Sequence, residues 1–184
     1  LLVDYKASQV NNLLERPTHP QFSVEQLVTQ VKPGNKYFLS ADITGAFFTH
    51  PLQEGPEGGD VTTFLTHRGK YFFTVLPQGC CVSQDFLGST LSEALDHKDL
   101  KDDENKQVIR IIDDIAGCCK DLPTFKRLCK ALFTRCKEYN VKLNPAKFRV
   151  STSHINFAGV VISKEGVSPC LLYTSDAADE QQRG

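Results

Sequence analysis

The sequence contains neither methionine nor tryptophan, has no apolar run approaching 18 residues, and carries a formal net charge of only −1. A membrane-spanning helix needs about 20 predominantly apolar residues, so the sequence offers no candidate for one. Residues 1–6 lack the basic and apolar segments of a signal peptide, and we expect none. Because a complete reading frame would begin with methionine, we expect the chain to be a piece of a longer protein. The near-neutral charge gives no electrostatic argument for nucleic acid, although a carboxylate cluster can offset a basic groove.

Seven cysteines are present, and four of them form the vicinal pairs Cys80-Cys81 and Cys118-Cys119. Neighbouring cysteines rarely form a disulfide without strain, and no Cys-x-x-Cys or Cys/His metal spacing occurs. We therefore expect reduced thiols that pack as small apolar side chains in an intracellular protein. A redox or zinc-binding role is the alternative.

The composition is that of a folded chain. Of the 184 residues 40% are apolar, and 12 are phenylalanine, which excludes a wholly disordered chain and allows one compact domain or two small lobes. Ser23 and Ser83 are expected to cap two of the helices. Hairpins interleaved with helices predict an α+β fold, with an antiparallel sheet and helices packed on one face. The expected strands are residues 1–6, 37–43, 61–66, 71–75, 108–112, 115–119, 141–150 and 155–162, and the expected helices are residues 24–31, 83–97 and 121–139.

Two adjacent acids follow a nearly apolar, β-branched run. Asp113 and Asp114 come directly after residues 108–112, and strand character resumes at residues 115–119, so we expect the pair at the tip of a hairpin. Buried carboxylates are costly unless they are paired, hydrogen-bonded or bound to a metal. In a plain strand the two side chains would point to opposite faces, so only a turn lets both reach one site.

A third acid, Asp42, lies near the end of the predicted strand 37–43. If the two strands lie side by side, three carboxylates converge at one end of the sheet. Hard oxygen ligands of this number suit Mg²⁺. Two such ions can clamp the attacking and leaving oxygens of a phosphoryl displacement. Solvation would explain any one aspartate at a turn, but the arrangement of all three favours a metal site.

Seven blocks of sequence form an ordered set of motifs: residues 2–6, 37–52, 62–71, 76–79, 111–115, 142–148 and 157–163. In this order, across residues 1–169, they resemble the reverse transcriptases of gypsy-type long-terminal-repeat retrotransposons. The resemblance implies a right-hand polymerase that copies RNA into DNA. The palm and part of the fingers would be present here.

The resemblance also implies roles for individual residues. Asp42 and Asp113 would bind two Mg²⁺ ions, or Mn²⁺ in their place, with Asp114 completing the catalytic site. Phe47 would lie beneath the incoming sugar and exclude a 2′-hydroxyl, the alternative being a phenylalanine of the plain core. Lys147 would lie near the triphosphate, the alternative being a surface lysine. The other implied contacts are those of Ile43, Gln78 and Gly79 with the incoming nucleotide and template, and those of Ala158, Gly159 and Val160 with the primer end.

Some positions depart from the family's pattern. Ile111 stands where an aromatic residue is usual and Gln84 where a proline is usual, but neither is an expected metal ligand. By the resemblance, a basic hairpin that binds the triphosphate would precede Leu1, and a thumb would follow the last block. We therefore expect the isolated chain to be inactive or nearly so.

The implied partners are an RNA or DNA template–primer, deoxynucleotides and the rest of a retroelement polyprotein (thumb, RNase H and integrase), with no membrane. The implied location is the cytoplasm, in a retrotransposon particle. Residues 1–169 would be the fingers and palm fragment. The run from Cys170 to Glu180 resembles the translation of a sequencing-library adapter, so we expect residues 170–184 to be a non-native tail. An ordinary polar tail is the alternative.

Two other functions stay open at this point. One is a palm-like relic that holds nucleic acid without chemistry. Such a relic would tolerate the loss of Asp42, Asp113 and Asp114, which are all present. The other is a polymerase that makes RNA on an RNA template, which would need a small or polar group in place of Phe47.

Overall fold

The centre of the molecule is a four-stranded antiparallel sheet with the strand order β4-β5-β1-β6. The structure is a computed structural model that describes residues 3–5, 7–15, 23, 26, 29–52, 61–97, 100 and 106–170. The four strands are β1 (Tyr37–Asp42), β4 (Lys106–Ile111), β5 (Asp114–Cys119) and β6 (Arg149–Ser151).

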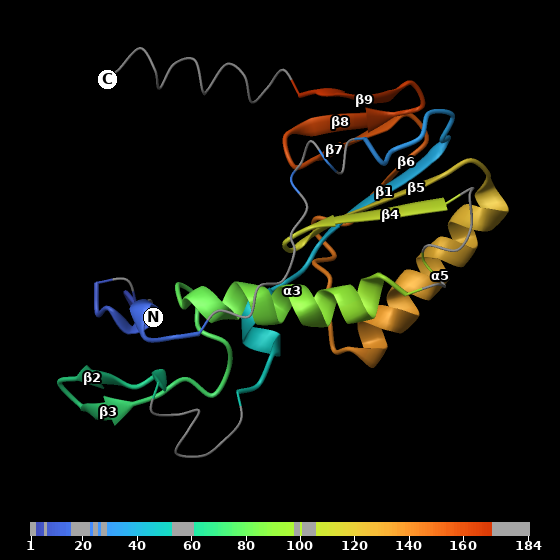
Figure 1. Cartoon of the computed structure of the whole chain (residues 1–184). Coiled ribbons are helices and arrows are strands. Elements are labelled where there is room, and N and C mark those ends of the chain that lie inside the picture. Colours follow the sequence, from blue (N-terminus) through green and yellow to red (C-terminus); the bar gives the residue numbers. More distant parts are fainter. Residues whose placement is uncertain are drawn as a thin grey trace, which may run out of the picture.

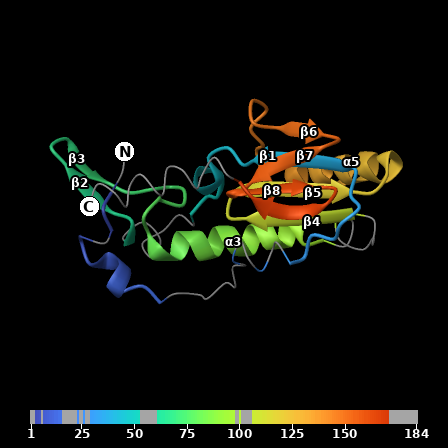
Figure 2. The same cartoon turned by 90° about the horizontal axis from the view of Figure 1, so that it is seen from above.

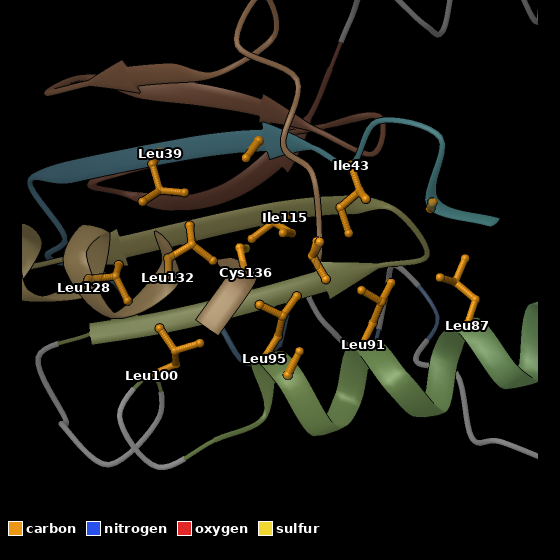
Figure 3. Packing of buried hydrophobic residues seen from close by; sticks show 14 of the residues in the cluster. Leu39, Ile43, Leu87, Leu91, Leu95, Leu100, Ile115, Leu128, Leu132 and Cys136 are labelled. Atoms are coloured by element: carbon orange, nitrogen blue, oxygen red, sulfur yellow. The ribbon is translucent and has the colours of Figure 1, made fainter. Parts of the chain in front are cut away.

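Two helices, α3 (Cys81–Leu95) and α5 (Leu122–Glu138), cover one face of this sheet (Figure 1). Leucines at helical spacing on α3 point at the strands, as Figure 3 shows for Leu87, Leu91 and Leu95. The start of α5 is fixed by Asp121, whose carboxylate accepts a hydrogen bond from the Thr124 N–H at 2.8 Å. The helices and the sheet face enclose the larger of the two apolar cores that the described residues form.

A second, three-stranded antiparallel sheet packs on the opposite face (Figures 1 and 2). Because successive side chains of a strand point to opposite faces, Leu39 belongs to the core under the helices, whereas Phe38 belongs to the core under this smaller sheet. The central sheet is therefore covered on both sides. The strands of the smaller sheet are β7 (His154–Phe157), β8 (Val160–Ser163) and β9 (Gly166–Pro169).

The remaining described elements lie toward the N-terminal end of α3 (Figures 1 and 2). A separate hairpin consists of β2 (Phe64–Thr66) and β3 (Gly69–Tyr71). Two 3₁₀ helices, η1 (Val10–Asn12) and η2 (Ala46–Thr49), complete the set. In the described part of the chain, no helix is long and apolar enough to cross a membrane.

The structure confirms the α+β fold with an antiparallel sheet and helices on one face. The predicted strand 37–43 is β1, which ends at Asp42. The predicted helix 121–139 is α5, with Asp121 and Tyr139 as its caps. All seven cysteines lie among the described residues and are free thiols, as expected.

The limits of four predicted strands were wrong. Residues 155–162 form β7 and β8, separated by a two-residue turn at Ala158 and Gly159. Only the end of residues 141–150 is a strand, because the Asn144 side chain accepts a hydrogen bond from the Ala146 N–H and closes a local turn. Residues 61–75 form a shorter hairpin than predicted, with residues 67–68 as its loop.

The predicted strand 1–6 was also wrong where the structure describes it. Val3, Asp4 and Tyr5 lie outside any strand, and the Ser8 N–H donates to the Asp4 carbonyl in a turn. Residues 1, 2 and 6 lie outside the described residues. The described part of the chain therefore begins with turns and η1 rather than with a strand.

The predicted cap of the helix 83–97 was wrong as well. Helix α3 begins at Cys81, whose N–H donates to the Asn11 side chain at 2.9 Å. A residue 70 positions away thus supplies the acceptor that Ser83 was expected to provide, and Ser83 itself is buried in the helix. Ser23 and Gln26 do exchange the two hydrogen bonds of a capping box. Half of the predicted helix 24–31 lies outside the described residues, and its predicted end was wrong, because residues 29–30 form a turn.

Candidate active site

Asp42 and Asp114 lie directly opposite each other in the antiparallel pair β1–β5. Side chains at directly opposed positions of such a pair share a face, with Cβ atoms about 5 Å apart. Both residues line one pocket at the end of the sheet. The predicted convergence of Asp42 and Asp114 is therefore a consequence of the register between β1 and β5.

Asp113 lies beside this pair, on a turn. The β4–β5 hairpin closes through the two residues Ile112 and Asp113, because Ile111 already pairs with Asp114. The tip was predicted at Asp113-Asp114, but the structure has it one residue earlier, at Ile112-Asp113, because Asp114 is already the first residue of β5. The Asp113 carbonyl accepts a hydrogen bond from the Ile43 N–H at 2.9 Å, which ties the turn to the end of β1.

Lys147 reaches the same carboxylates from the turn that precedes β6. Its Nζ lies 2.9 Å from Oδ1 of Asp42. The turn is anchored to β1, because the Asn144 N–H donates to the Asp42 carbonyl at 2.8 Å. The Lys147 side chain is 62% exposed and that of Asp42 is 19% exposed, so the ion pair lies at the rim of the pocket.

The clustering of like charges changes the proton affinity of the site. Burial raises the pKa of Asp114, and the neighbouring carboxylates of Asp113 and Asp42 raise it further, whereas Lys147 lowers it. The pKa of Lys147 is raised by its hydrogen bond to Asp42 and by the three negative charges around it. The site has an excess of negative charge that one lysine only partly offsets.

The pocket is bounded on its other side by the smaller sheet. Ala158 and Gly159, the turn between β7 and β8, line it together with Asp42, Asp114 and Lys147. Both turn residues have positive φ, 47° and 81°, which is the signature of a type I′ turn. The turn expected to hold the primer end therefore faces the same space as Asp42 and Asp114, whereas Asp113, the third expected catalytic residue, is not among the residues that line this pocket.

The donor chemistry of the site fits a divalent cation. Carboxylate oxygens are the protein ligands that Mg²⁺ takes, and a cationic ammonium already pairs with Asp42. Among the described residues, no three histidine, cysteine or acidic side chains are arranged as a ready-made metal site. A cation here would thus be held by one or two carboxylates together with substrate phosphates, which is how Mg²⁺ usually binds.

The other predicted site residues do not line this pocket. The Ile43 side chain is only 3% exposed and belongs to the core, so only its backbone faces the aspartates. Phe47 is half-buried in η2 and packs against the same core. Gln78 and Gly79 are exposed in the turn before α3, and Val160 is half-buried at the start of β8.

Residues that the sequence reasoning missed also line the pocket: Ser40, Asn156 and Phe157. Ser40 could have been found from the two-residue period of β1, since it shares a face with Asp42. Asn156 and Phe157 could not, because no local pattern shows which strand of a second sheet will lie over the acids.

The family described as "Reverse transcriptase (RNA-dependent DNA polymerase)" matches residues 2–162. The chain is 28% identical over 170 residues to the "Retrovirus-related Pol polyprotein from transposon 412" of Drosophila melanogaster. It is 26% identical over 174 residues to the "Transposon Tf2-3 polyprotein" of Schizosaccharomyces pombe. Each match covers 92% of this chain, but only 13% and 12% of the respective polyproteins.

Solved structures of foamy viral protease-reverse transcriptase share the fold. One complex with double-stranded DNA superposes with a TM-score of 0.80 at 19% identity, over 95% of this chain and 29% of the other. A complex with an RNA/DNA hybrid gives a TM-score of 0.79 at 18% identity, over 94% of this chain and 22% of the other. The likeness confirms the expected palm-type polymerase fold.

Proposed function

We propose that this chain, which belongs to the reverse transcriptase (RNA-dependent DNA polymerase) family, carries the nucleotidyl-transfer site of an RNA-directed DNA polymerase. The source would be a gypsy-type retrotransposon polyprotein. The observation that carries the proposal is the opposition of Asp42 and Asp114 across β1 and β5, with Asp113 beside them in the hairpin turn. Since the chain spans only 12–13% of its curated relatives, the thumb, RNase H and integrase would be supplied by the rest of the polyprotein.

The proposed reaction is an in-line displacement at phosphorus. The primer 3′-hydroxyl loses its proton to solvent and its oxygen forms a bond to the α-phosphorus of a deoxynucleoside triphosphate. The bond from the α-phosphorus to the oxygen that bridges to the β-phosphate breaks, and pyrophosphate leaves. Asp42, Asp113 and Asp114 would hold two Mg²⁺ ions, which supply charge stabilisation to the attacking and leaving oxygens. The chain's own contribution is to hold three carboxylates close together in spite of their mutual repulsion.

Lys147 would act on the phosphate side of the reaction. Its ammonium already lies at the rim of the pocket, 2.9 Å from Asp42. A triphosphate brings more negative charge than one carboxylate, so the lysine would pair with the leaving phosphates once substrate is bound. This role needs no change of backbone, because the side chain is exposed.

The remaining assignments concern the primer, the template and the sugar. The Ala158-Gly159 turn with Val160 would hold the primer end, since the turn faces the aspartates across the pocket. Gln78 and Gly79 would contact the incoming nucleotide and template, and Phe47 would exclude a 2′-hydroxyl. Most of the affinity would come from phosphates, and sequence would be copied by base pairing rather than by protein contacts to bases.

The test is primer extension by the longer polymerase that contains this chain. Changing Asp113→Asn should lower the rate at least about a hundredfold, because several kcal/mol of charge stabilisation would be lost. The matched control is Asp121→Asn, which also removes one negative charge but keeps the cap of α5, since asparagine is an equally good N-cap. Equal rates for the two variants would refute the proposal.

The alternative is a nucleic-acid-binding relic. A wild-type polymerase that binds a template–primer tightly in a filter-binding assay but does not extend it would favour that alternative. Extension abolished by Asp113→Asn would exclude it.

We also propose the boundaries and location that the resemblance implies. Residues 1–169 would be the fingers and palm segment, present in a cytoplasmic retrotransposon particle, and residues 170–184 would be non-native. Cys170 is buried and its N–H donates to the Gly159 carbonyl, whereas residues 171–184 lie outside the described residues. If the codons of this segment differ from the nucleotide sequence of the adapter, the tail is not read-through and this proposal is refuted.

A further inference from the structure

Arg110 is a lone charge in the apolar run that precedes the two adjacent aspartates. Its guanidinium points to helix α3 and to the hairpin turn. One terminal nitrogen, Nη1, donates to the Ile112 carbonyl at 3.1 Å. The other, Nη2, donates to Oγ of Ser92 at 3.0 Å and to the Gly88 carbonyl at 3.4 Å. The side chain therefore links the turn that carries Asp113 to the neighbouring helix.

The backbone on both sides of Asp113 is held by contacts to other elements. The carbonyl before it, of Ile112, accepts from Arg110, and its own carbonyl accepts from the Ile43 N–H. Ile112 has a φ of 52°, a conformation that β-branched residues rarely adopt. Such a backbone persists only where the surrounding structure holds it in place.

If Arg110 only filled space, an apolar side chain at this position would give a more stable fold. Its Nε is buried and has no hydrogen-bond partner among the described residues, and a buried donor without a partner destabilises the folded state. An apolar side chain would avoid that cost. The planar guanidinium, however, offers several donors in a fixed geometry, which suits it to hold a carbonyl and a helix at the same time.

We infer that Arg110 is a positioning residue, which fixes the Ile112 carbonyl to α3 and thereby sets where the Asp113 carboxylate lies relative to Asp42 and Asp114. Its catalytic consequence rests on the proposed polymerase function, whereas its effect on the turn does not.

The test uses hydrogen exchange and cation binding in the full chain. In Arg110→Gln the Ile43 amide, which donates to Asp113, should exchange at least about tenfold faster. The affinity for Mn²⁺, measured by electron paramagnetic resonance, should fall by about tenfold, because the carboxylates are no longer held together. Arg110→Lys should give an exchange rate and a Mn²⁺ affinity between those of the wild type and those of Arg110→Gln, since lysine keeps the charge and one donor.

The matched control is Arg135→Gln. Arg135 also donates to carbonyls of α3, those of Glu93 and Ala94, but from α5. It should lower the unfolding midpoint without changing Mn²⁺ affinity or the exchange of the Ile43 amide. In the longer polymerase, Arg110→Gln should lower kcat about tenfold or more with little change in KM for the deoxynucleotide.

Unchanged exchange at Ile43 in Arg110→Gln would overturn the inference, and so would an equal change in Arg135→Gln. If Arg110→Gln does not fold, Ser92→Ala and Arg110→Lys are milder changes in which Ile43 exchange and Mn²⁺ affinity can be measured. Wild-type exchange and affinity in both variants would overturn the inference. The proposed function has a separate test. Undiminished Mn²⁺ affinity in Asp42→Asn would refute the metal site, and the exchange of the Ile43 amide would then still decide the role of Arg110.

Discussion

Lys147 and Asp42 lie 105 positions apart in the sequence and form an ion pair, with Nζ 2.9 Å from Oδ1. The pair exists because the turn after Asn144 is hydrogen-bonded to the end of β1 through the Asp42 carbonyl. One positive charge is thereby added to a site with three negative ones. The pKa of Asp114, which this lysine lowers, should therefore depend on it.

The first prediction concerns the pKa of Asp114, which burial and two neighbouring carboxylates raise above its ordinary value. Lys147→Gln should raise this pKa further, because it removes the positive charge that lowers the pKa of Asp114. Asp42→Asn should lower it, because it removes a like charge. Carboxyl ¹³C chemical shifts followed against pH would measure both effects, and shifts of the same sign in the two variants would contradict the electrostatic account.

The same shift determines how stability depends on pH. A raised pKa means that the folded chain binds a proton more tightly than the unfolded chain, so ionised Asp114 destabilises the fold above its raised pKa. Asp114→Asn should therefore be more stable than the wild type at pH 7, and the difference should shrink as the pH falls toward the ordinary value of 3.8. Urea unfolding at several pH values tests this, and a gain that grows toward acid pH would refute it.

The second prediction concerns the sugar. Phe47 packs its half-buried ring against the core under the helices. If its free face lies beneath the incoming sugar, Phe47→Val should increase ribonucleotide incorporation at least about tenfold relative to deoxynucleotides, since a steric clash is removed. Competitive primer extension by the longer polymerase measures the ratio. Phe48→Val, at an exposed neighbour, is the control and should leave it unchanged.

The third prediction concerns packing behind the site. A Cβ on Gly117 of β5 would lie 2.9 Å from Cγ of Leu39 and 3.0 Å from Cδ2 of Leu128. Gly117→Ala should therefore destabilise the fold by about 1–3 kcal/mol through overpacking. Chemical denaturation measures this.

A second substitution distinguishes a clash from a change in strand propensity. Leu39→Ala alone should cost about 2–5 kcal/mol. Leu39→Ala makes room for the added methyl of Gly117→Ala. The double variant should therefore lose less unfolding free energy than the two single variants together, by about 0.5–3 kcal/mol. Strict additivity would show that the two side chains do not meet.

The fourth prediction concerns the β7–β8 turn. Ala158 has a φ of 47°, which asparagine tolerates better than alanine, and asparagine followed by glycine is the preferred pair for a type I′ turn. Ala158→Asn should therefore stabilise the fold by several tenths of a kcal/mol to about 1 kcal/mol. Ala158→Val should have the opposite effect, because a β-branched residue is strained at positive φ. Denaturant midpoints of the two variants on the same side of the wild type would contradict this account.

Local sequence alone determined the elements with strong periodic patterns and clear caps. Helix α5 was predicted within a residue at each end, because its apolar stripe and the cap at Asp121 are both local. The hairpin that carries Asp113 and Asp114 was predicted from an apolar β-branched run interrupted by two acids. These features depend on neighbours within a few residues, which a sequence displays directly.

Tertiary structure decided what local pattern could not. The start of α3 is set by Asn11, from a segment 70 positions upstream. The strand register that places Asp42 opposite Asp114, the ion pair of Asp42 with Lys147, and the link from Arg110 to α3 all join residues distant in sequence. The sequence therefore determined which residues could carry the chemistry, whereas the packing of strands and turns from separate segments determined which of them meet, because contact across a sheet depends on register rather than on sequence spacing.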